Sequence, residues 1–132
     1  MDVAIINEFL NTQFGEFHPV PVVESATPAE ASVTLPFHER WLRPGNTLSG
    51  PAMMTLADTV AYVALIARNN DAISSVTSNL NIHFLRRPAP TDLLGRGRVI
   101  KSGRNTAVVS VDLLTEGELV AHATVSYALV RK

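Results

Sequence analysis

The sequence predicts an α+β fold in which a curved antiparallel sheet wraps around one central helix. Residues 51–67 are almost entirely apolar or small, which is typical of a helix buried on several sides. From residue 74 onward, apolar and polar side chains alternate in segments separated by short turns, as expected for antiparallel strands. The apolar run is the element best suited to fill the inner face of such a sheet.

Size and composition limit the possibilities. With 132 residues, of which 46% are hydrophobic and 17% charged, the chain can bury a real core, and we expect a single domain over 1–132. The absence of Cys excludes disulfides and a Cys nucleophile. A net charge of −1 argues against nucleic-acid binding. The His residues lack the spacing of metal ligands, so we expect no metal and no cofactor.

We expect a short amphipathic helix within residues 1–15, with Asp2 as N-cap and Gly15 as the residue after its end. Two extended segments follow, at residues 19–27 and 30–37. Prolines confine the first of them to a sheet edge or strand start. The sequence lacks the basic N-terminal region of a secretory signal, so the cytoplasm is the expected compartment.

The central helix is predicted over 51–68. Pro51 suits the first helical position, where its missing N–H costs nothing, and Ser49 or Gly50 would be the N-cap. A membrane span is not expected. The run is at the lower limit of length, and the central carboxylate, Asp58, would cost about 2.5–3.5 kcal/mol to insert.

Residues 74–130 predict a four-strand meander with hairpin turns at Ser102-Gly103 and Glu116-Gly117. In the first strand, the period of two places Thr77 and Asn79 on one face, together with the polar residues 81 and 83. Six of the 11 basic residues fall within nineteen positions around the second strand, opposed only by Asp92; they are Arg86, Arg87, Arg96, Arg98, Lys101 and Arg104. Their simplest role is a solvated surface, and the alternative is a patch for a small phosphorylated ligand.

Asp58 interrupts a segment that is otherwise expected to be buried. A buried carboxylate is costly unless it is paired, hydrogen-bonded or used in function. Several stretches resemble the hot-dog thioesterases of the PaaI (phenylacetic acid degradation) type, from about Arg43 to the C-terminus. They are "SGPAMMTLADT", "VTSNLNIHFLRRPA", "GRVIKSGRNTAVVSVDLL" and "GELVAHATVSYAL". The resemblance implies a hot-dog fold and an acyl-CoA thioesterase.

The family signature is a His-Gly-Gly turn that opens the helix, followed by an acidic residue in a Leu-Ala-Asp context. Asp58 matches the catalytic carboxylate. The turn reads Ser49-Gly50-Pro51 here, so the first Gly is kept, whereas the His and the second Gly are not. An Asn six residues before the His is replaced by Arg43, with Asn46 nearby. Thr77 matches the polar residue that orients the carboxylate or its water.

The resemblance implies specific roles. The Gly50 N–H, at a helix N-terminus, would polarise the thioester carbonyl. Asp58 would either attack the carbonyl or deprotonate a water, and the sequence leaves both routes open. Residues expected to bind substrate are Ser49, Asn46, Arg43, Asn79, Arg86, Arg87 and Arg104, the last three by their charge toward the phosphates of coenzyme A.

The resemblance also implies a homodimer or a dimer of dimers, in which the helix-opening turn of one protomer meets the carboxylate of the other. The expected partners are acyl-CoA and further copies of the chain, without nucleic acid or membrane.

A non-catalytic acyl-CoA-binding module is the alternative, because the His of the turn is absent. A hydratase is less favoured, since that chemistry uses a His on the helix and this helix has none. The acyl group is left open, as is the choice between coenzyme A and a carrier protein.

Overall fold

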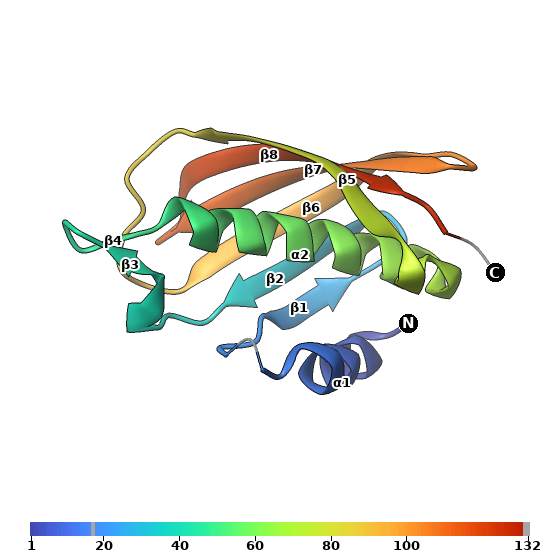
Figure 1. Ribbon diagram of the computed structural model, residues 1–132, viewed down its shortest axis with the longest axis horizontal. Helices are drawn as coiled ribbons and strands as arrows, with labels where there is room; N and C mark the ends of the chain where they lie inside the picture. The colour runs from blue at the N-terminus through green and yellow to red at the C-terminus, as the bar shows by residue number, and fades with distance from the viewer. Residues whose placement is uncertain (17, 131–132) are drawn as a thin grey trace.

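The computed structural model describes residues 1–16 and 18–130. Within them, one six-stranded antiparallel sheet of order β1-β2-β6-β7-β8-β5 curves around helix α2 (Figure 1). The helices are α1 (Val3–Phe14) and α2 (Gly50–Arg68), with the short 3-10 helices η1 (Glu39–Trp41) and η2 (Asn70–Ser74). The strands are β1 (Val22–Ala26), β2 (Glu30–Leu35), β3 (Leu42–Arg43), β4 (Thr47–Leu48), β5 (Val76–Phe84), β6 (Leu93–Ser102), β7 (Thr106–Thr115) and β8 (Glu118–Ala128). The predicted α+β hot-dog architecture is confirmed.

Both helices begin at side-chain caps. The side chain of Asp2 accepts a hydrogen bond from the Ile5 N–H at 2.9 Å. Ser49, rather than Gly50, caps α2 by accepting from the Ala52 N–H at 3.2 Å. Gly15 has a φ of −62°, so it does not adopt the left-handed conformation expected of a glycine after a helix end.

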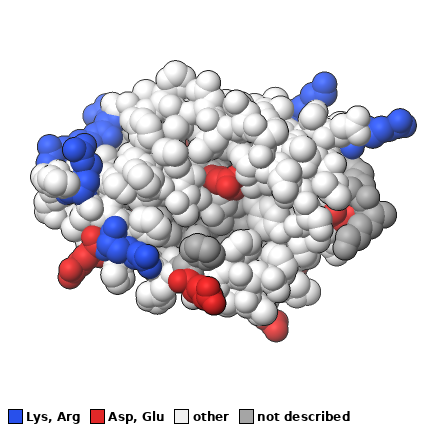
Figure 2. Space-filling model, viewed as in Figure 1, with Lys and Arg blue, Asp and Glu red and all other residues white. Residues whose placement is uncertain are grey.

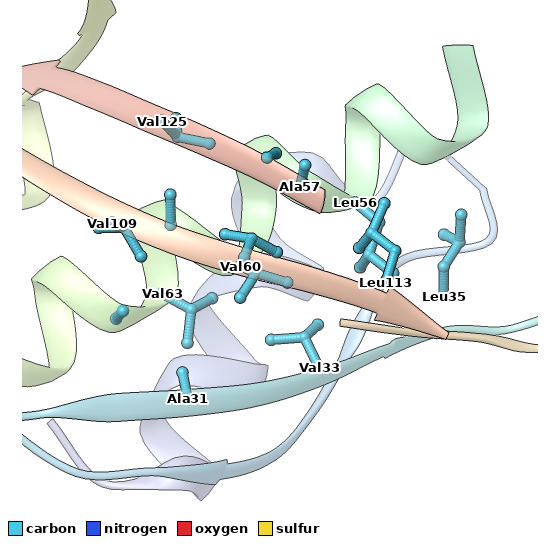
Figure 3. Packing of buried hydrophobic residues seen from close by; sticks show 14 of the residues in the cluster. Ala31, Val33, Leu35, Leu56, Ala57, Val60, Val63, Val109, Leu113 and Val125 are labelled. Carbon is cyan, nitrogen blue, oxygen red and sulfur yellow. The ribbon is translucent and has the colours of Figure 1, made fainter. Parts of the chain in front are cut away.

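Helix α2 lies on the inner face of the sheet, mainly against β2, β6 and β7. Its side chains pack against those strands in a core that contains no charged side chain among the described residues (Figure 3). Two glycines of β6 allow the close approach. A Cβ on Gly95 or Gly97 would lie 2.5 Å or 2.6 Å from the Val60 side chain. Although α2 has the length and hydropathy of a membrane span, this packing makes it the core helix of the domain.

The strand order departs from the expected meander. Strands β6, β7 and β8 follow one another as hairpins, but β5 pairs with β8 and lies at the free edge of the sheet. The expectation assumed that consecutive strands pair. The connection over 85–92 instead carries the chain from one edge into the middle of the sheet. The segment between β2 and α2 contains η1 and the small hairpin formed by β3 and β4.

Candidate active site

Asp58 opens onto a cavity of about 680 Å³ beside α2. Its neighbour Ala57 is fully buried, whereas Asp58 is only half-buried, because successive helical residues point about 100° apart. The cavity lies between α1, the segment 19–21 and Trp41 on one side and η2 with the start of β5 on the other. Its lining residues are Leu10, Phe14, Pro19, Val20, Pro21, Trp41, Thr55, Asp58, Thr59, Tyr62, Ile73, Ser74, Ser75, Val76, Thr77 and Tyr127.

Two hydroxyl groups donate to the same oxygen of the carboxylate. Thr77 Oγ1 lies 2.6 Å from Asp58 Oδ1, and the phenolic oxygen of Tyr127 lies 2.9 Å from it. The predicted contact between Thr77 and Asp58 is therefore confirmed. Burial, followed by the charge of Asp58, raises the pKa of Tyr127 well above its usual range. The phenol is therefore neutral near pH 7 and acts as a donor.

A bulge decides which residues of β5 face the carboxylate. Thr77 pairs with Tyr127, but the next pair is Asn79 with Ser126, so Ser78 is the extra residue. Directly paired residues share a face of the sheet, and the extra residue reverses the alternation. Asn79 therefore lies on the outer face, opposite to Thr77. The expectation that these two residues share a face is wrong, and Asn79 does not line the cavity.

Aromatic side chains form one end of the cavity. The ring of Tyr62 stacks on that of Tyr127 at 6.2 Å between centroids, and Phe14 meets Tyr62 edge-on at 6.5 Å. The Tyr62 hydroxyl donates to the Ile73 carbonyl at 2.7 Å, and burial raises the pKa of Tyr62. Trp41 adds an indole whose Nε1 is buried and has no hydrogen-bond partner among the described residues. These walls suit an apolar group.

The opening turn of α2 does not meet Asp58 within one chain. Gly50 and Asp58 are eight positions apart in the chain, which corresponds to about 12 Å along the helix axis. Neither Ser49 nor Gly50 lines the Asp58 cavity. The neighbour of Gly50 is instead Phe84, whose ring would lie 3.7 Å from a Cβ placed on that glycine.

The predicted substrate-binding residues divide between two ends of the molecule. Arg87 donates to the Gly45 carbonyl in the β3–β4 turn that carries Asn46 and follows Arg43. Arg86 lies beside Arg87 and pairs with Glu118 at 3.6 Å, both side chains being exposed. Arg104 lies in the β6–β7 turn. Figure 2 shows Lys and Arg side chains gathered at both ends of the molecule, near the start of α2 and near the β6–β7 turn.

Residues 45–127 match the thioesterase superfamily, which is more than half of the chain. The chain belongs to the thioesterase superfamily.

Individual relatives are similar over most of their length. "Putative esterase SSO2140" of Saccharolobus solfataricus is 30% identical over 102 residues, covering 76% of this chain and 72% of the relative. A putative thioesterase from Silicibacter sp. TM1040 has a TM-score of 0.87 and 32% identity, covering 98% and 92% of the two chains. A hypothetical thioesterase protein from Streptococcus pneumoniae, with coenzyme A, has a TM-score of 0.76 and 23% identity over 85% and 87%.

For this member of the thioesterase superfamily, sequence reasoning missed Tyr127 as a partner of the carboxylate. The alternation of the last strand places Tyr127 on the inner face. A tyrosine there needs a hydrogen-bond partner for its hydroxyl, and this requirement was the available signal. Among residues 1–16 and 18–130, no group of three or more His, Asp or Glu is arranged to hold a metal ion.

Proposed function

We propose that this protein is an acyl-CoA thioesterase of the PaaI type, which hydrolyses a thioester to a free acid and coenzyme A in the cytoplasm. The observation that carries the proposal is the Asp58 carboxylate, held at one oxygen by Thr77 and Tyr127 on the wall of an apolar cavity. Membership of the thioesterase superfamily and the esterase and thioesterase names of the relatives support thioester cleavage. The relative with coenzyme A supports that carrier.

Asp58 is the reacting group. Either its free oxygen attacks the carbonyl carbon and expels the thiolate, leaving a mixed anhydride that water then hydrolyses, or it takes a proton from a water that attacks directly. Both routes end in the same acid and thiol. Thr77 and Tyr127 keep the carboxylate oriented in either case.

The Gly50 N–H polarises the thioester carbonyl, and it comes from a second copy of the chain. The distance of about 12 Å between Gly50 and Asp58 along one helix makes the site incomplete in a single chain. Strand β5 supports a contact between copies, because it is an edge of the sheet and its apolar side chains Val76 and Phe84 are 58% and 51% exposed. Homodimers joined at β5, or tetramers formed from two such dimers, are therefore part of the proposal.

The carrier binds where α2 begins. Arg43, Arg87 and Asn46 lie around the β3–β4 turn, close in the chain to the Gly50 N–H at the start of α2, and this combination attracts phosphate. Ser49 and Arg86 flank them. Arg104 joins this set where a second copy brings the β6–β7 turn to the start of α2. The acyl group occupies the aromatic-walled cavity beside Asp58.

A non-catalytic acyl-CoA-binding module remains the second candidate. One observation favours it: the His of the family's helix-opening turn is Ser49 here, and the Ser49 hydroxyl already accepts from the Ala52 N–H to cap the helix.

The deciding experiment compares wild type with Asp58→Asn on short, medium, long and aryl acyl-CoAs, following release of free thiol. We expect wild type to turn over and Asp58→Asn to lose at least about a hundredfold in kcat. Asp71→Asn is the matched control, because Asp71 is an exposed carboxylate of η2 outside the cavity. Binding without turnover on every substrate would favour the binding module and contradict the thioesterase.

A further inference from the structure

We infer that Tyr127 is a positioning residue for Asp58: with Thr77 it fixes Oδ1 and leaves Oδ2 as the oxygen that reacts. This inference rests on the proposed function, since it assigns work within the same site. It concerns which oxygen of the carboxylate meets the substrate or the water, and which side chain determines that choice.

The hydrogen bonds to the carboxylate are unequally distributed. Both Thr77 and Tyr127 donate to Oδ1, at 2.6 Å and 2.9 Å. Among the described residues, none donates a hydrogen bond to Oδ2. The phenol has one proton, and its distance to the Asp58 backbone carbonyl is longer, at 3.3 Å, so the carboxylate oxygen is the better acceptor. Two donors on one oxygen restrain rotation of the carboxylate and leave the other oxygen available.

Of the two donors, Tyr127 is the rigid one. Its strand is hydrogen-bonded on both sides, because Tyr127 pairs with Ala107 on β7 and with Thr77 on β5. Its side chain is nearly fully buried, and its ring stacks on Tyr62. Thr77, by contrast, is an exposed residue of an edge strand. A donor held this firmly sets the orientation of a half-buried carboxylate at the side of a cavity.

The protonation state of the phenol agrees with a donor role. Burial first, and the Asp58 charge second, raise the pKa of Tyr127, so the hydroxyl keeps its proton throughout the working range of pH. Asp58, Tyr62 and Tyr127 are the ionisable groups among the described residues that line this cavity. The Tyr62 hydroxyl is directed to the Ile73 carbonyl, so it does not compete for Asp58.

Tyr127→Phe tests the inference, because it removes the hydroxyl and keeps the ring. We expect kcat to fall about tenfold, the effect of losing one hydrogen bond, with KM little changed. Loss of the donor also changes the hydrogen bonding of the carboxylate, so the ¹³C chemical shift of the Asp58 carboxyl carbon should move at a fixed neutral pH. A purely structural role would lower stability and would move neither kcat nor this chemical shift in the folded protein.

Tyr62→Phe is the matched control, because it removes the hydroxyl of the neighbouring ring, which contacts Ile73 instead. It should leave the ¹³C chemical shift of Asp58 in place. An unchanged kcat and an unchanged ¹³C chemical shift in Tyr127→Phe would overturn the inference. If that variant does not fold, the Tyr127 hydroxyl proton of wild type is measured by NMR. Its signal should move on Asp58→Asn and not on Asp71→Asn, and a signal indifferent to Asp58→Asn would overturn the inference.

The two proposals can fail separately. If Asp58→Asn hydrolyses thioesters as fast as wild type, the catalytic role of Asp58 fails, and the inference built on it fails with it, whatever the chemical shifts show. If Asp58→Asn is inactive while Tyr127→Phe matches wild type in both kcat and ¹³C chemical shift, the proposed function holds and only the role of Tyr127 is overturned.

Discussion

Thr77 on β5 is the direct cross-strand partner of Tyr127 on β8, and the hydroxyl groups of both residues meet at a single oxygen of Asp58. The arrangement depends on the bulge at Ser78, which lets Thr77 face inward while the polar residues after it face outward. The free edge of the sheet thus contributes one donor to the carboxylate, and the interior of the sheet contributes the other.

This pairing predicts a difference between two substitutions of Thr77. Thr77→Val keeps the branched shape and removes the hydroxyl, so we expect kcat to fall about tenfold, in line with one lost hydrogen bond. Thr77→Ser keeps the donor and should retain most of the activity. Steady-state kinetics with one acyl-CoA compares the two. A loss in Thr77→Ser with none in Thr77→Val would show that the methyl group matters and not the hydroxyl.

The sequence predicted the elements better than their arrangement. The apolar run and the alternation of the later segments were sufficient to predict α2 and the strands, because both signals are local. The position of β5 beside β8 was not predictable in this way, because strand pairing depends on contacts distant in the sequence. The bulge at Ser78 carried no glycine or proline to mark it, so the faces of Thr77 and Asn79 could not be separated.

The candidate site was predictable in part. The contact between Thr77 and Asp58 followed from the family resemblance, whereas Tyr127 lies nearly seventy residues from Asp58 and matched no motif. The grouping of the arginines was also hidden, because Arg87 and Arg104 are close in the sequence but are separated by the whole length of β6, one preceding the strand and the other following it.

The close approach of α2 to β6 predicts a loss of stability in Gly95→Ala. The added methyl group would lie 2.5 Å from the Val60 side chain, and overpacking of this kind costs roughly 1–3 kcal/mol. Urea unfolding measures the change. Gly103→Ala is the control, because the neighbour of its methyl group among the described residues is the Thr106 carbonyl, at an ordinary contact distance of 3.6 Å. If overpacking is the cause, adding Val60→Ala to Gly95→Ala should lower the stability by less than the sum of the two single changes.

The aromatic end of the cavity predicts the effect of Phe14→Ala on substrate preference. Phe14 lines the cavity and meets Tyr62 edge-on, so its removal extends the space open to an acyl group. We expect kcat/KM for longer or bulkier acyl-CoAs to rise relative to kcat/KM for short ones. This ratio should increase about tenfold when the enlarged cavity buries one or two further methylene groups of the acyl chain. A series of acyl-CoAs of increasing length measures the ratio. An unchanged ratio would place the acyl group elsewhere.

The exposed inner side of β5 predicts that Phe84→Glu abolishes both assembly and activity. Phe84 is 51% exposed in the single chain and lies next to Gly50, so a charge there would be buried without a partner in a β5-mediated dimer. Analytical ultracentrifugation should show a monomer, and thiol release should fall with it. Ile5→Glu is the matched control, since Ile5 is 52% exposed on α1, away from β5. A monomeric variant with full activity would show that Gly50 of a second copy is not needed for hydrolysis.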